Sequence, residues 1–79
     1  MLVKFTVLPA KTELYIRADM VLLVERDKQN PLQTLITTNI MTARGPLIYP
    51  VAETPDEVAR LVATTMFEAA KYKSGIVLN

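Results

Sequence analysis

The segment from Thr54 to Glu57 constrains the fold more strongly than any other part of this sequence, because it marks the start of a helix. Threonine caps a first turn well, proline fits the first helical position, and a glutamate three residues after the cap completes a capping box. The acidic side chains lie where the helix dipole favours negative charge, and Lys71 and Lys73 lie near the other end. We therefore predict one long helix over residues 55–72.

The residues before this helix show the alternation of apolar and polar side chains that is typical of strands. The predicted strands cover residues 2–8, 14–16, 20–24, 32–40 and 47–51. Met20 to Val24 is a continuous apolar run, which favours a central strand covered on both faces. Pro50 cannot donate to a strand ladder, so either its strand lies at an edge of the sheet or the proline lies at the end of its strand.

These patterns predict an α+β fold, with a small antiparallel sheet of four to five strands followed by one long helix in the C-terminal half. A chain of 79 residues has room for a single domain, which we expect to span residues 1–79. Residues 76–79 favour a further strand or a docking tail. We expect edge strands near residues 47–51 and 76–78 to be able to pair between copies of the chain.

The predicted helix carries more apolar surface than a small sheet can cover. At about 100° per residue, its polar side chains form a stripe only roughly 80° wide, whereas a helix on a small sheet needs an apolar stripe of about 100°. The excess has two explanations: a contact with a partner or a second copy, or a wide core within the subunit. We predict the contact. Its candidate residues are Ala59, Ala63, Met66, Phe67, Ala70, Ile76, Val77 and Leu78.

The composition also predicts exposed apolar surface. Apolar residues make up 51% of the chain and aromatic residues only 6%, so the apolar side chains are mostly aliphatic. A domain of this size buries only about 60–65% of the surface that its unfolded chain exposes. Some apolar surface is therefore expected to stay outside the core, and exposed apolar patches on small proteins usually mark contacts with partners.

The residue types that carry most catalysis are absent from this sequence. It contains no histidine and no cysteine, which removes the commonest general base, the commonest metal ligand and the best nucleophile. The carboxylates show no calcium-loop spacing, and Gly45 and Gly75 are too isolated to form a phosphate-binding loop. We therefore predict a protein that is not an enzyme and that has no catalytic residues, no metal site and no cofactor.

The charge balance argues against a nucleic acid as the partner. Nine Lys and Arg residues against eight Asp and Glu residues give a net charge of +1, and acidic residues interrupt the basic ones. Nucleic-acid binding normally needs clustered positive charge. The apolar runs are far shorter than the roughly 20 residues that span a bilayer, so we expect no membrane insertion. We expect protein partners, including the chain itself, and a location in the cytoplasm or in a larger complex assembled from it.

Two stretches of the sequence carry a family pattern. The first is E-L-Y-I-R-A-D-M-V with a later V-E, and the second is Y-P-V-A-E-T-P-D-E-V. They resemble the flagellar and swarming-motility (FlbD-like) family, which has an F-x-L-N-x-D-x-I stretch, an I-E ending and a V-x-E-S-x-E-E-V junction between strand and helix. The resemblance covers residues 5–25 and 47–62, and Asp19 and Glu25 occupy its best-matched polar positions. Residues 27–46 depart from it, because the family has a tight hairpin where this chain has a longer stretch.

The resemblance implies a small non-enzymatic protein that supports flagellar function, with no catalytic site to carry over. One alternative is a structural or accessory protein of a phage or virion that forms an oligomeric assembly. A small nucleic-acid-binding domain is a lesser alternative. All three are hypotheses about the partner of the same small α+β domain.

Overall fold

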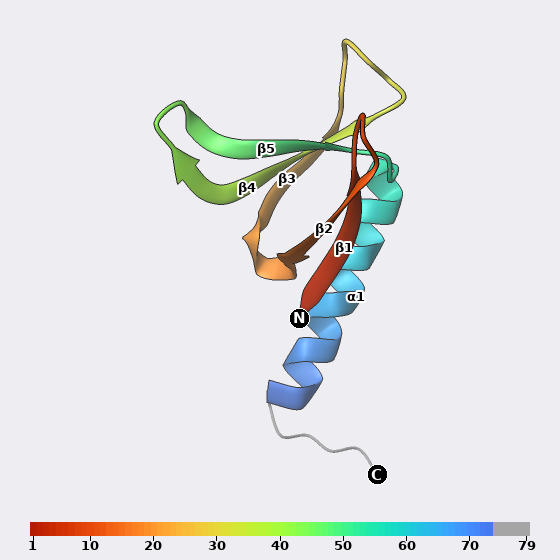
Figure 1. Ribbon diagram of the computed structural model, residues 1–79. Coiled ribbons are helices and arrows are strands. Elements are labelled where there is room, and N and C mark those ends of the chain that lie inside the picture. The colour runs from red at the N-terminus through yellow and green to blue at the C-terminus, as the bar shows by residue number, and fades with distance from the viewer. Residues whose placement is uncertain (74–79) are drawn as a thin grey trace.

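A computed structural model describes the backbone of residues 1–73 and the side chains of residues 1–70, and it has five strands and one long helix (Figure 1). The elements in chain order are β1 (Leu2–Val7), β2 (Thr12–Arg17), the 3-10 helix η1 (Ala18–Met20), β3 (Val21–Arg26), β4 (Thr34–Thr42), β5 (Gly45–Val51) and α1 (Pro55–Lys73). The five-stranded antiparallel sheet and the single helix in the C-terminal half confirm the predicted α+β fold.

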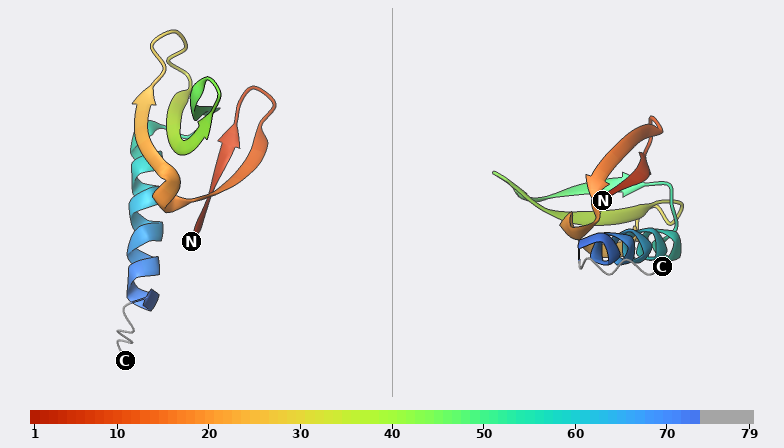
Figure 2. Two further views of the ribbon diagram at one scale, coloured as in Figure 1. Left: turned by 90° about the vertical axis from the view of Figure 1, so that its left-hand side faces the viewer. Right: turned by 90° about the horizontal axis from the view of Figure 1, so that it is seen from below.

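The sheet has the strand order β2-β1-β5-β4-β3, so a β1–β2 hairpin joins a β3–β4–β5 meander through β1 and β5. That junction is short: Val7 pairs with Val51, and the Leu8 N–H donates to the Pro50 carbonyl at 2.9 Å. Helix α1 contacts β1, η1 and β3. The views of Figure 2 show α1 along one side of the meander, with the tip of the β1–β2 hairpin pointing away from it.

The hydrophobic core lies where the sheet, η1 and the start of α1 meet. Its buried apolar residues are Val3, Phe5, Ile16, Ala18, Ile36, Val51 and Val58. Helix α1 contributes Val58, which is fully buried, and Val62 packs against the same cluster. Among the side chains described, these are the two residues of α1 that take part in this apolar core, and both lie in the first half of the helix.

The start of α1 is held in two ways. The Thr54 hydroxyl accepts a hydrogen bond from the Glu57 N–H at 3.2 Å, and the Glu57 carboxylate accepts one from the Thr54 N–H at 2.9 Å. This is the capping box that the sequence predicts. The Glu53 carboxylate also accepts hydrogen bonds from the N–H and the hydroxyl of Thr6, at 3.0 and 3.1 Å, and so ties the residues before the helix to β1.

The prediction that the run from Met20 to Val24 forms a central strand is wrong. Strand β3 lies at the edge of the sheet, and Leu22 and Leu23 are 64% and 51% exposed. The register with β4 shifts between Val21 and Leu23, because a bulge inserts one extra residue there. A continuous apolar run can therefore arise from an edge strand with a bulge, and it does not require burial on both faces.

The prediction that residues 47–51 form an edge strand able to pair between copies is also wrong, because β5 lies between β1 and β4. Pro50 is the next-to-last residue of β5, which is the second of the two predicted alternatives. The Pro50 carbonyl accepts a hydrogen bond from the Leu8 N–H, so it points toward β1. The nitrogen of the same residue points in the same direction, but the pairing of β1 with β5 has already ended at Val7. The missing N–H therefore costs no hydrogen bond. The predicted strand at residues 76–78 lies outside the described residues.

Candidate interaction surface

Helix α1 presents a second apolar face, whose side chains stay largely exposed in the subunit. At about 100° per residue, Val58, Val62, Thr65 and Ala69 share the face turned to the sheet, and these side chains are buried or half-buried. A second set, which we call the α1 stripe, is centred about a third of a turn away around the helix. It consists of Ala59, Ala63, Met66, Phe67 and Ala70, and all five are exposed.

The α1 stripe contains five of the eight contact residues predicted from the sequence. Met66 is 44% exposed and Phe67 is 63% exposed, and the two large side chains lie next to each other on the same side of the helix. The alternative explanation of a wide core within the subunit therefore does not hold for these five residues. The other three, Ile76, Val77 and Leu78, lie outside the described residues, and the contact role of all eight stays a prediction.

The later turns of α1, coloured blue in Figure 1, extend past the end of the sheet at which β1 begins. Val58 and Val62 are the apolar helix residues in or against the core, whereas the stripe continues about two turns further along the helix, to Ala70. Part of the stripe is thus carried on a projecting segment of helix. A second helix can approach such a segment without first displacing the sheet.

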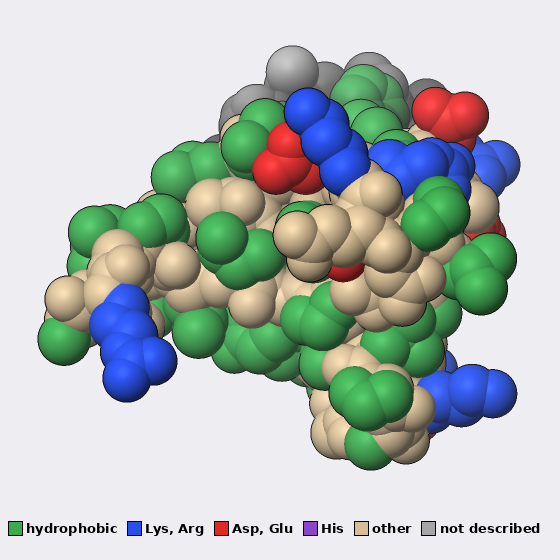
Figure 3. Space-filling view, turned by 90° about the horizontal axis from the view of Figure 1, so that it is seen from above, with side chains coloured by type: hydrophobic (Ala, Val, Ile, Leu, Met, Phe, Trp, Pro, Cys, Tyr) green, Lys and Arg blue, Asp and Glu red, His purple; other side chains and the backbone are tan. Residues whose placement is uncertain are grey.

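Other exposed apolar side chains are distributed over several elements. Leu22 and Leu23 lie on β3, Leu32 follows β3 in the loop, and Met41 and Ile48 lie on the β4–β5 hairpin. In the space-filling view of Figure 3, hydrophobic side chains form several groups separated by polar side chains and backbone. Single exposed apolar residues of this kind are normal on a small protein. The α1 stripe differs because its members follow one another along one face of one element.

Sequence patterns missed two of these exposed sites. Leu32 is the first residue of the predicted strand 32–40, but it lies in the turn before β4 and is 86% exposed. The turn-forming residues Asn30 and Pro31 directly before it are the local signal that the turn continues to this position. Met41, which is 70% exposed, lies near the tip of the β4–β5 hairpin, beyond an irregularity in pairing that begins after Thr37. No local signal in the sequence marks that irregularity.

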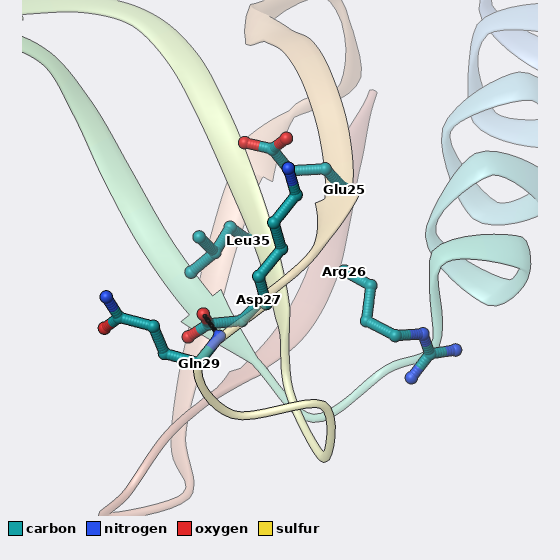
Figure 4. Close-up of a pocket in the computed structure, with 6 residues that line it drawn as sticks. Glu25, Arg26, Asp27, Gln29 and Leu35 are labelled. Atoms are coloured by element: carbon teal, nitrogen blue, oxygen red, sulfur yellow. Dashed lines mark hydrogen bonds between the residues drawn. The ribbon is translucent and has the colours of Figure 1, made fainter.

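A polar pocket of about 470 Å³ lies beside the β3–β4 loop (Figure 4). Its lining residues are Glu25, Arg26, Asp27, Lys28, Gln29 and Leu35. The Asp27 carboxylate accepts hydrogen bonds from the Gln33 side chain at 2.8 Å and from the Gln29 N–H at 2.9 Å, and these bonds hold the pKa of Asp27 below its usual value. The Arg26 guanidinium donates to the Pro31 carbonyl at 2.7 Å and extends to the opposite side of β3 from Glu25 (Figure 4).

These hydrogen bonds close the loop between β3 and β4. Asp27 accepts from two residues that follow it, as aspartate does in turns, so its carboxylate is occupied by the loop itself. Within the described side chains, His, Cys, Asp and Glu residues form no group of three or more that could hold a metal ion. The geometry of this pocket therefore supports a loop-stabilising role for Asp27.

No helix in the described part of the chain is long and apolar enough to cross a membrane.

Comparisons with known proteins identify no relative of this chain. No family model, no curated protein and no solved structure matches the chain. The resemblance to the FlbD-like family stays a prediction, and the α1 stripe is the surface on which a functional proposal can be built.

Proposed function

We propose that this protein is a non-enzymatic interaction module that self-associates through the α1 stripe. The observation that carries the proposal is the exposure of a continuous apolar set on one helix face, including Met66 and Phe67. Burying a large apolar side chain contributes about 1.5–3 kcal/mol, and both of these keep about half of their surface in water within the subunit. A second copy carries the same stripe, so its own Met66 and Phe67 contribute a similar free energy when the two copies associate.

The size of the stripe limits the affinity. Two large side chains and three alanines per copy make a small interface, and association must first offset about 4–15 kcal/mol of lost translational and rotational freedom. We expect a dissociation constant in about the micromolar range for an isolated pair of subunits. Such a contact becomes stable where it is repeated, as in a ring, a filament or a multi-protein complex.

The resemblance to the FlbD-like family supports a motility accessory role as the specific setting of this module. The resemblance includes the junction between β5 and α1, where Glu53 and the capping box position the helix. Assembly into a phage or virion is the alternative setting, and it would use the same stripe. The two settings differ in the partner and not in the surface.

Sedimentation equilibrium across a wide concentration range tests self-association. We expect the apparent mass to rise above that of the 8.8 kDa chain as the concentration increases. The rise is expected to be only weakly sensitive to salt, because apolar burial and not exposed charge drives it. A mass that stays at 8.8 kDa up to about millimolar concentration, well above the expected dissociation constant, would refute self-association.

A further inference from the structure

We infer that two copies of the chain pair their α1 helices side by side in antiparallel orientation, with Ala63 of one copy against Met66 of the other. This inference rests on the proposed self-association and adds its geometry. It follows from the spacing of the stripe, from the sizes and charges along it, and from the position of the sheet on the helix.

The spacing of the stripe is that of a helix–helix seam. Ala59, Ala63, Met66 and Ala70 are separated by four, three and four residues, which is the heptad spacing of paired helices. Phe67 lies beside this seam and widens it. Three of the four seam positions are alanine, so the two helices can approach more closely than the usual 8–10 Å between axes.

The sizes of the seam residues favour the antiparallel orientation. With the two-fold axis between Thr64 and Thr65, Ala59 meets Ala70 of the second copy and Ala63 meets Met66. Each large side chain then packs against a small one, which is how interdigitated layers fill space. In a parallel pair, Met66 would meet Met66 and Ala63 would meet Ala63, leaving one layer crowded and the next one open.

The charges at the helix ends favour the same orientation. Asp56 lies three residues before Ala59, in the first turn, at the position that continues the seam. The last turn of the helix contains the sequence positions Lys71 and Lys73. An antiparallel pair brings the acidic first turn of one copy to the basic last turn of the other, and it also opposes the helix dipoles. A parallel pair brings Asp56 to Asp56, and like charges repel.

The sheet also leaves room for the antiparallel pair. The core holds only the first half of α1, through Val58 and Val62, and the later turns project beyond the sheet (Figure 1). Antiparallel pairing places the two sheets at opposite ends of the helix pair, so that each sheet lies beside the projecting turns of the other copy. Parallel pairing would place both sheets at the same end, where they compete for the same space.

Disulfide trapping in the full chain tests the orientation. The sequence has no cysteine, so Ala59→Cys and Ala70→Cys each introduce the single thiol of the chain at an exposed helix position. The two variants are mixed, with ¹⁵N in one of them, and oxidised with a glutathione couple. Intact-mass spectrometry then separates the two like pairs from the mixed pair. Thr64→Cys, on the polar side of the same helix, is the matched control.

The antiparallel pair predicts that the mixed disulfide of the Ala59→Cys and Ala70→Cys variants exceeds the like pairs at least tenfold. Mixtures that contain Thr64→Cys are expected to show only the proportions of random collision. Like pairs in excess, or random proportions for the first mixture, overturn the antiparallel geometry. If the unmodified protein is also monomeric by sedimentation, self-association itself has failed; if it is oligomeric, only the orientation has failed.

Discussion

Replacing Phe67 by aspartate separates the part that this residue plays in assembly from its part in folding. A phenylalanine side chain buries about 150–250 Å² when fully covered, and Phe67 is 63% exposed in the subunit. About 125 Å² is therefore still available to a partner, and about 75 Å² is already covered. At about 25 cal/mol per Å², these areas correspond to about 3 kcal/mol for association per copy and about 2 kcal/mol for folding.

Both figures are upper limits, since an unfolded chain already covers part of its apolar surface and a partner need not cover all of Phe67. The aspartate adds an unpaired charge to the interface, which increases the loss in association but costs little on an exposed helix face. We expect Phe67→Asp to abolish self-association up to about millimolar protein, where an undisturbed micromolar contact is saturated, and to leave a cooperative unfolding transition.

The assay combines sedimentation equilibrium with urea unfolding followed by circular dichroism. Thr64→Asp is the matched control, because Thr64 is exposed on the polar side of the same helix and receives the same charge. It is expected to keep the association of the original chain. A Phe67→Asp protein that does not fold, or that folds and still associates as the original chain does, would show that Phe67 is not an assembly contact.

Two further predictions concern the start of α1. Thr54→Ala removes the capping hydroxyl and is expected to lower the free energy of unfolding by about 1 kcal/mol, measured by urea denaturation; no loss of stability would contradict the capping role. Hydrogen bonds from Thr54 lower the pKa of Glu57, so its stabilising contribution is complete above the ordinary value of 4.5 and is lost as the pH falls through the lower, folded-state pKa. Glu57→Gln is expected to flatten the pH dependence of stability below about pH 4.5, and an unchanged slope would contradict that assignment.

The parts of the fold that depend on neighbouring residues could be predicted from the sequence. The capping box predicts the first residue of α1, and the structure begins the helix at Pro55. The alternation in residues 2–8 predicts a strand, and the structure has β1 there with the alternating residues Val3 and Phe5 buried. In both cases the signal and the structure lie within a few residues of each other, so no distant contact had to be known.

The order of the strands could not be predicted in the same way. Whether β3 or β5 lies at the edge depends on which strands pair, and these pairs join residues far apart in the chain, such as Val7 and Val51. Pro50 is compatible with a central strand only because β1 ends beside it, which its own neighbours do not reveal. The bulge in β3 likewise depends on its register with β4.

The α1 stripe could be predicted because helical periodicity alone decides which side chains share a face. The sheet packs against the side of the helix that carries Val58, and the set that includes Met66 lies on a different side and stays exposed. The identity of the partner has no such local signal. It depends on the surface of a second molecule, which the sequence of one chain describes only if that molecule is another copy.

A concentration series of ¹⁵N-labelled protein, followed by amide chemical shifts, tests the use of the α1 stripe most directly. The signals of Ala59, Ala63, Met66 and Ala70 are expected to move together as the protein is concentrated, whereas that of Ala18, buried in the core, stays in place. Shifts confined to the β4–β5 hairpin, or no shifts at all up to millimolar protein, would contradict the account.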